Sequence, residues 1–196
     1  MLSTLVGNLV RNQLQRLGYY LAQTRLTPNA FTLIGLLLNV IVAAIIASGN
    51  LLVGGIMALV AGAFDMLDGA VARSTGQVTK FGGFFDSTLD RYSEAIVYFG
   101  LLIYLMNTDA GTTAVALLFA AIIGSLMVSY SRARAEAAGV DAEVGIFARP
   151  ERIILLAILL MFNQPVIALW ILAIVTNFTT MQRIFHVWRE TRYGSE

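Results

Sequence analysis

Six apolar segments dominate this chain and restrict it to a helical membrane fold. They cover residues 30–48, 51–73, 81–107, 112–137, 149–163 and 165–188. A transmembrane helix needs about 20 apolar residues to cross a hydrocarbon layer of about 30 Å. Most of the segments are long enough, but the fifth is short and ends at the break Asn163-Gln164-Pro165. We therefore predict an all-α polytopic membrane protein with six transmembrane helices.

The overall composition agrees with this class. Hydrophobic residues make up 58% of the 196-residue chain, and its mean hydropathy is +0.75. A soluble domain of this length would carry far more charge. Cysteine is absent, which excludes disulfides, thiolate ligands and a cysteine nucleophile. No internal repeat or soluble domain is visible, so residues 1–196 are expected to form a single membrane domain.

The N-terminal residues show the pattern of an amphipathic helix over residues 2–22. Arg11 and Arg16 occupy its polar face, and the apolar positions recur at helical spacing: Leu2, Leu5, Val6, Leu9, Val10, Leu14, Leu17 and Leu21. We predict that this helix lies in the membrane interface.

The basic residues sort to one side of the predicted membrane. If six spans follow the interfacial helix, every Lys and Arg falls on one side of the membrane. Asp109 is then the only charged residue on the opposite side. Cytoplasmic loops are enriched in Lys and Arg, so the basic side, with both termini, is predicted to face the cytoplasm. The residues on this side are Arg11, Arg16, Arg25, Arg73, Lys80, Arg91, Arg132, Arg134, Arg149, Arg152, Arg183, Arg189 and Arg192.

Four carboxylates lie inside this apolar sequence. Asp65 and Asp68 are spaced i, i+3 near the end of the second segment, and Asp86 and Asp90 are spaced i, i+4 near the start of the third. Each pair shares a helix face. Carboxylates in a membrane are costly and indicate function. Hard oxygen ligands on two facing helices suit Mg²⁺ or Mn²⁺, as two ions about 4 Å apart.

Small residues and an arginine accompany the carboxylates. Gly69, Ala72 and Gly82 would let a ligand approach the helix backbone, and Arg73 offers a charge for phosphate oxygens. This combination indicates a metal–diphosphate site. The alternative is an ion network that only packs helices, but four acids beside Arg73 and Arg91 would leave excess buried negative charge.

These positions form the motif D-x₂-D-G-x₂-A-R-x₈-G-x₃-D-x₃-D, which resembles the signature of the CDP-alcohol phosphotransferases. The match runs from Asp65 to Asp90 without a departure. The resemblance covers the whole chain, including the interfacial helix and six spans. It implies transfer of a phosphatidyl-type group from a CDP-linked lipid to an alcohol, with release of CMP, and it suggests a homodimer.

The resemblance also implies roles for individual residues. Asp65, Asp68 and Asp86 would hold the metal ions, with Asp90 near them. Asp90 would also be the catalytic base that takes the proton of the acceptor hydroxyl, in a direct displacement without an enzyme-bound intermediate. The implied CDP-binding residues are Asn29, Thr32, Asp65, Asp68, Gly69, Ala72, Arg73 and Gly82. For the segment Thr27-Pro28-Asn29, simple helix initiation is the alternative.

Three later motifs bear on the acceptor: Ser129-Tyr-Ser-Arg-Ala-Arg-Ala-Glu136, Arg149-Pro-Glu-Arg152 and Gln182-Arg183. They resemble the phosphatidylinositol phosphate synthase branch, which implies 1L-myo-inositol 1-phosphate as acceptor. Its phosphate would be bound by arginines drawn from Arg132, Arg134, Arg152 and Arg183. Arg132 and Arg134 cannot both share a narrow helix face, and at least one is expected to face the cavity. Arg132 stands where this branch often has lysine.

Several alternatives stay open at this stage. Glycerol 3-phosphate is also a phosphorylated acceptor, and an archaeal-type CDP-lipid would use the same chemistry. The arginines could instead serve only membrane topology and lipid headgroups. A metal-ion or proton transporter would need acids through the membrane depth, whereas these lie near one side. A helical scaffold would leave the acids unexplained. Membrane lipids are expected partners, and nucleic acid is not.

Overall fold

The computed structural model describes residues 26–193, apart from the side chains of Asp68 and Tyr193, and within that range it contains six α-helices and no strand. The all-α prediction is therefore confirmed for this part of the chain. The predicted interfacial helix over residues 2–22 lies outside the described residues. The helices are α2 (Pro28–Ala47), α3 (Leu51–Thr75), α4 (Lys80–Met106), α5 (Gly111–Ala137), α6 (Arg149–Met161) and α7 (Pro165–Tyr193).

Short polar caps set the helix boundaries on the side of the carboxylates. The Thr27 side chain accepts a hydrogen bond from the amide of Ala30, and Pro28 occupies the first turn of α2. Thr79 caps α4 in the same way, accepting from the Gly82 amide at 2.9 Å. Helix α3 ends at Gly76, whose φ of 67° is a left-handed conformation that glycine adopts without strain. These caps keep the connection between α3 and α4 short.

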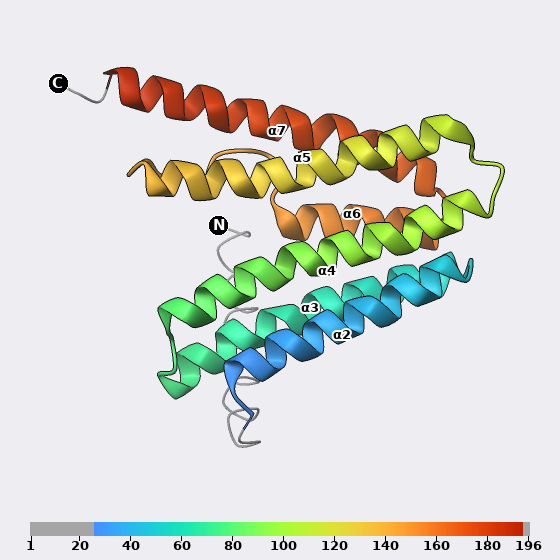
Figure 1. The fold of residues 1–196 in the computed structure, drawn as a ribbon, viewed down its shortest axis with the longest axis horizontal. Coiled ribbons are helices and arrows are strands. Elements are labelled where there is room, and N and C mark those ends of the chain that lie inside the picture. Colours follow the sequence, from blue (N-terminus) through green and yellow to red (C-terminus); the bar gives the residue numbers. More distant parts are fainter. Residues whose placement is uncertain (1–25, 194–196) are drawn as a thin grey trace, which may run out of the picture.

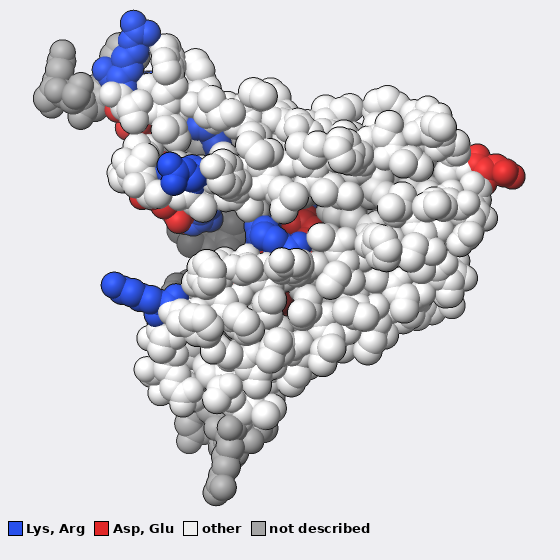
Figure 2. All heavy atoms as spheres, in the orientation of Figure 1, with Lys and Arg blue, Asp and Glu red and all other residues white. Residues whose placement is uncertain are grey.

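The helices form two groups joined by α6. Helix α2 packs against both α3 and α4, α5 packs against α7, and α6 contacts both α3 and α7 (Figure 1). Helices α4 and α5 are connected by a turn at residues 107–110, and they diverge away from that turn (Figure 1). The divergence opens the bundle at the end where α2, α4 and α6 begin. Basic and acidic side chains line the hollow there (Figure 2).

The hydrophobic core occupies the other half of the bundle. Its fully buried members come from the halves of the helices that adjoin the turns at residues 48–50, 107–110 and 162–164: Val42, Ile46, Leu101, Leu105, Leu118, Leu160, Leu169 and Leu172. At Gly100, an added Cβ would lie 2.4 Å from the carbonyl oxygen of Ala43. Glycine is thus required where α4 crosses α2. The apolar half holds the helices in place, and the polar half is left open.

Four of the described helices are long and apolar enough to cross a membrane: α2, α3, α5 and α7. Helix α4 has 27 residues but carries the charges of the site, and α6 has only 13 residues. A helix of 13 residues rises about 20 Å, less than the hydrocarbon thickness of about 30 Å. The integral membrane character is therefore supported by four helices, and the number of six crossings stays a prediction.

Candidate active site

Three carboxylates from two helices converge on one another. Asp65 on α3 and Asp86 and Asp90 on α4 offer ligand oxygens that all lie within 4.8 Å of one another. All three residues are partly buried. Asp68 follows Asp65 by one helical turn on α3, but its side chain is not among those described. Carboxylate oxygens at this separation fit a hard divalent cation such as Mg²⁺ or Mn²⁺.

Arg149, the first residue of α6, bridges two of these carboxylates. Its Nη1 atom hydrogen-bonds to Oδ2 of Asp65 and lies 2.6 Å from Oδ1 of Asp90. The second oxygen of Asp90 is 3.3 Å from the guanidinium of Arg91. A divalent cation would use the same carboxylate oxygens, so a bound cation and the Arg149 guanidinium would compete for them.

A pocket of about 560 Å³ opens beside the carboxylates between α2, α3 and α4. We call it the α2–α4 pocket. Its wall combines the first turn of α2, the small-residue face of α3 and the loop before α4. The lining residues are Thr27, Pro28, Asn29, Thr32, Gly69, Ala72, Arg73, Gln77, Val78, Thr79, Gly82, Gly83 and Asp86. Six residues predicted to bind CDP are thereby brought together, whereas Asp65 lies outside the lining.

A second, larger cavity of about 770 Å³ lies on the other side of α4, facing α5 and α7. We call it the arginine cavity, because five guanidinium groups line it. They belong to Arg91, Arg132, Arg149, Arg152 and Arg183, and Ser87 and Ser129 are also in the wall. Arg149 belongs to this wall and also pairs with Asp65 and Asp90, so the cavity adjoins the carboxylates.

The arginines of this cavity are held in different ways. Arg132 pairs with Glu136 at 2.8 Å and with Glu143 at 2.9 Å, and it is partly exposed. Arg183 is buried, and it donates to the backbone carbonyl oxygens of Val144 and Val128. Arg183 therefore ties the segment between α5 and α6 to both α5 and α7.

Arg152 is the most deeply buried of the five. Its side chain is 1% exposed and makes a two-pronged ion pair with Glu94 on α4, with Nε–Oε1 at 2.8 Å and Nη2–Oε2 at 2.9 Å. Such a paired geometry fixes the plane of the guanidinium group. Arg91 is held from α5, where its Nη1 donates to the Ser129 hydroxyl.

Comparison with known proteins identifies the family. A family model described as CDP-alcohol phosphatidyltransferase matches residues 25–182, which is most of the chain. The chain belongs to this family. The resemblance carried by the motif from Asp65 to Asp90 is thus confirmed, and the chain is a member of an enzyme class.

Relatives within the family carry names that specify a product. The archaetidylinositol phosphate synthase of Pyrococcus horikoshii is 40% identical over 186 residues, which cover 94% of this chain and 96% of the relative. The phosphatidylinositol phosphate synthase of Mycobacteroides abscessus is 35% identical over 169 residues, covering 82% of this chain and 77% of the relative.

Solved structures of the family share the fold. The crystal structure of the Mycobacterium tuberculosis phosphatidylinositol phosphate synthase with CDP-DAG bound superposes with a TM-score of 0.81 at 31% identity, covering 89% of this chain and 93% of the other. The structure of that enzyme in complex with manganese and citrate gives a TM-score of 0.83, covering 89% and 88%. The family thus includes an enzyme solved with manganese, the type of ion that the carboxylates of this chain fit.

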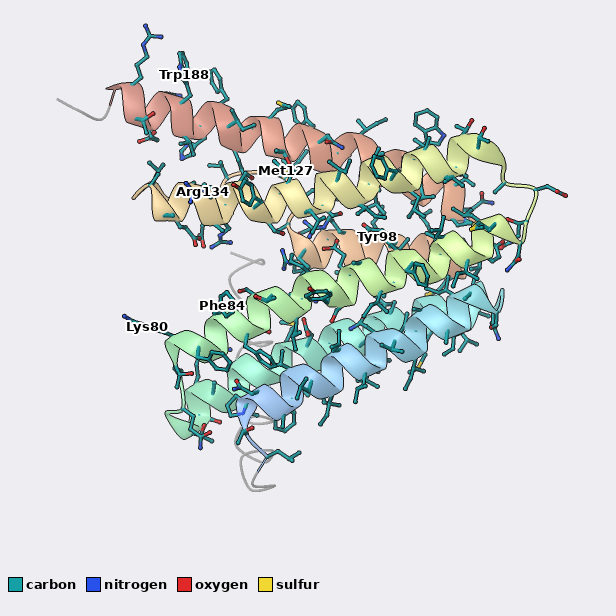
Figure 3. The ribbon with its side chains drawn as sticks, viewed as in Figure 1. Lys80, Phe84, Tyr98, Met127, Arg134 and Trp188 are labelled. Atoms are coloured by element: carbon teal, nitrogen blue, oxygen red, sulfur yellow. The ribbon has the colours of Figure 1, made fainter. Side chains whose placement is uncertain are left out.

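The structure leaves one predicted acceptor-binding residue outside the arginine cavity and adds site residues that the sequence analysis did not propose. Arg134 lies on the exposed end of α5 and is not in the lining of the arginine cavity (Figure 3). Glu94, Arg149 and the loop residues Gln77 and Val78 were not proposed as site residues. Arg149 carried a signal, because it opens the Arg149-Pro-Glu-Arg152 motif. The sequence signal for Glu94 was weaker: it is a further acid one helical turn after Asp90 in an apolar helix.

Proposed function

We propose that this protein transfers a phosphatidyl-type group from a CDP-linked lipid to inositol 1-phosphate, forming phosphatidylinositol phosphate and releasing CMP. The oxygen of the acceptor hydroxyl attacks the phosphorus that carries the lipid. The bond from that phosphorus to the CMP oxygen breaks, and the hydroxyl proton passes to Asp90. The displacement is direct, so no residue becomes covalently modified.

One observation supports this assignment most strongly: the carboxylates lie between two cavities of different chemistry. Asp86 is in the wall of the α2–α4 pocket. Arg149 is in the wall of the arginine cavity and contacts Asp65 and Asp90. A donor in the first cavity and an anionic acceptor in the second would meet at the carboxylates, as a two-substrate displacement requires.

The α2–α4 pocket suits the CDP part of the donor. Gly69, Ala72 and Gly82 present little side chain, and the exposed Arg73 supplies a charge at the rim. Asp65, Asp68, Asp86 and Asp90 are the proposed ligands for magnesium or manganese, and such ions stabilise charge on the diphosphate and on the CMP leaving group. The lipid tail would extend from this pocket into the membrane.

The arginine cavity suits an acceptor that carries its own phosphate. Guanidinium groups match phosphate oxygens in geometry and charge, and Arg132, Arg152 and Arg183 line the cavity as proposed phosphate ligands. The names of the relatives, both inositol phosphate lipid synthases, favour inositol 1-phosphate over glycerol 3-phosphate. Serine or free inositol would gain little from so many guanidinium groups.

A second donor is favoured by one comparison. The relative from Pyrococcus horikoshii, at 40% identity, is named for an archaetidyl product. An archaeal-type CDP-lipid is therefore the alternative donor, with the same acceptor and the same displacement. Both donors carry the same CDP group, so the α2–α4 pocket would suit either one.

The proposal includes an orientation in the membrane. We infer six crossings, with the basic ends of the helices and the active site in the cytoplasm, where CMP and sugar phosphates are soluble partners. A homodimer is part of this proposal by family resemblance. A transport role is disfavoured, because the described core on the far half is built of Val, Ile, Leu and Ala side chains together with Tyr98.

The proposal is tested by CMP release from purified protein in detergent with Mg²⁺. CDP-diacylglycerol and an archaeal-type CDP-lipid are each offered with inositol 1-phosphate, glycerol 3-phosphate, inositol or serine. Release with inositol 1-phosphate alone is the expected result, and the better donor identifies the lipid. Release only with glycerol 3-phosphate would keep the chemistry and overturn the acceptor, and no release with any pair would overturn the enzymatic proposal.

A further inference from the structure

Glu94 is a mostly buried acid that lies outside the family motif and outside the carboxylate group. It lies on α4 one helical turn beyond Asp90, so the two residues share a helix face. Its side chain is 10% exposed, and both of its oxygens are bonded to Arg152 on α6. A buried carboxylate is retained only where a specific partner compensates it.

The pairing with Glu94 leaves one nitrogen of Arg152 unused. Nε and Nη2 donate to Glu94, whereas Nη1 is fully buried and has no hydrogen-bond partner among the residues that the structure describes. Buried donors are nearly always satisfied, so an orphan donor calls for a ligand or a water molecule. Arg152 lines the arginine cavity, where an anionic ligand would be available to it.

The surroundings explain why Arg152 needs Glu94. Arg91 lies close enough to interact electrostatically with both members of the pair, and Arg149 lies close enough to interact with Glu94. Like charges repel, so without Glu94 the Arg152 guanidinium would turn away from its neighbours. Tyr98 follows Glu94 by one helical turn on α4 and belongs to the hydrophobic core. Its hydroxyl shares a hydrogen bond of 3.1 Å with the Ser125 hydroxyl.

We propose that Glu94 is a positioning residue for the acceptor: it holds Arg152 in the orientation in which Nη1 donates to the phosphate of the acceptor. This inference rests on the proposed function and adds to it a residue that acts through Arg152 without touching the substrate. It predicts that Glu94 affects the KM of a phosphorylated acceptor and leaves the donor side unchanged.

A water molecule is the competing occupant. A cavity of about 30 Å³ adjoins Glu94 and Arg152 and is also lined by Asn39, Tyr98 and Arg149. That volume exceeds the roughly 10–15 Å³ that a cavity needs to hold one water molecule. If Nη1 only binds this water, changes at Glu94 will not alter acceptor binding selectively.

The test compares E94Q, E94D and the control E190Q in steady-state assays with varied acceptor and varied donor. E94Q is expected to raise the acceptor KM about tenfold to a hundredfold, the effect of losing one charged hydrogen bond. Its kcat should stay within about threefold and its donor KM within about twofold. E94D keeps the charge on a shorter side chain and should fall between E94Q and the wild type. E190Q removes an equal charge from an exposed residue on α7 that lines neither cavity, and it should match the wild type.

A double-variant comparison separates positioning from general stability. In an R152M background, E94Q should raise the acceptor KM by less than twofold further, because residues acting through one contact are not additive. Melting temperatures are recorded for every variant, and E94D carries the test if E94Q does not fold. Any of three results would overturn the inference: an unchanged acceptor KM in E94Q and E94D, an equal rise in the donor KM, or effects on the acceptor KM that multiply in the double variant. If the wild-type protein releases no CMP with any phosphorylated acceptor, the proposed function fails, and this inference fails with it.

Discussion

Replacing Arg149 with methionine should strengthen divalent metal binding, although it removes a charge from the active site. Arg149 contacts Asp65 and Asp90, two of the three carboxylates that offer oxygens within 4.8 Å of one another. The side chains involved are only 11–17% exposed, so water screens the contacts incompletely. In the wild type, an incoming cation must displace the guanidinium group from these oxygens.

The expected magnitude follows from charge separation. A guanidinium group about 5 Å from a divalent cation costs about 7 kcal/mol at an effective dielectric constant of about 20. Each factor of ten in affinity corresponds to about 1.4 kcal/mol. In the wild type, Arg149 can turn partly away from a bound cation, so only part of this repulsion is lost in affinity. We therefore expect R149M to bind Mn²⁺ about 10- to 100-fold more tightly than the wild type.

The assay is Mn²⁺ titration followed by electron paramagnetic resonance, in the absence of substrates. R134M is the matched control, because Arg134 is exposed and does not line the cavity. Without metal, R149M should also melt below the wild type, and Mn²⁺ should raise its melting temperature by more. Equal or weaker Mn²⁺ binding by R149M would refute the competition between Arg149 and the cation.

Three further predictions concern the donor side and the fold. D90N should abolish CMP release while the Kd for the CDP-lipid stays within about threefold, and an equal loss of both would remove Asp90 from the role of base. R73A should raise the KM for the CDP-lipid about tenfold with the acceptor KM unchanged, and initial-rate assays with each substrate varied would reveal any effect on the wrong substrate. G100V should lower the free energy of unfolding by about 1–3 kcal/mol or more, since the added Cβ meets the backbone of Ala43, and an unchanged melting temperature in detergent would contradict this packing.

Local spacing explains why the carboxylate site could be predicted before the structure was considered. Residues i, i+3 and i, i+4 share a helix face whatever the rest of the chain does. Asp65 therefore faces the same way as the small residues of α3, and Asp86 faces the same way as Asp90. The short connection ending at Thr79 then leaves few ways to arrange α3 and α4. The helix bounds agree closely with most of the predicted apolar segments, because each apolar run ends at a polar, glycine or proline break that the sequence shows directly.

Positions that depend on contacts between distant helices were not predictable in this way. Arg132 and Arg134 are two residues apart and chemically identical, and only the packing of α5 on α7 determines that Arg132 lines the cavity. The pairing of Glu94 with Arg152 joins residues 58 positions apart. Helix α6 brings Arg152 there because it packs against both α3 and α7.

The sequence by itself determined the membrane class, the six apolar segments, the family motif and the pocket face of α3, because these follow from hydropathy and from spacing within single helices. The tertiary structure alone decided which arginines share a cavity, that Arg149 contacts Asp65 and Asp90, and that Glu94 pairs with Arg152. Those pairings depend on where α6 meets α4, and that position results from the packing of the whole bundle, which no local pattern encodes.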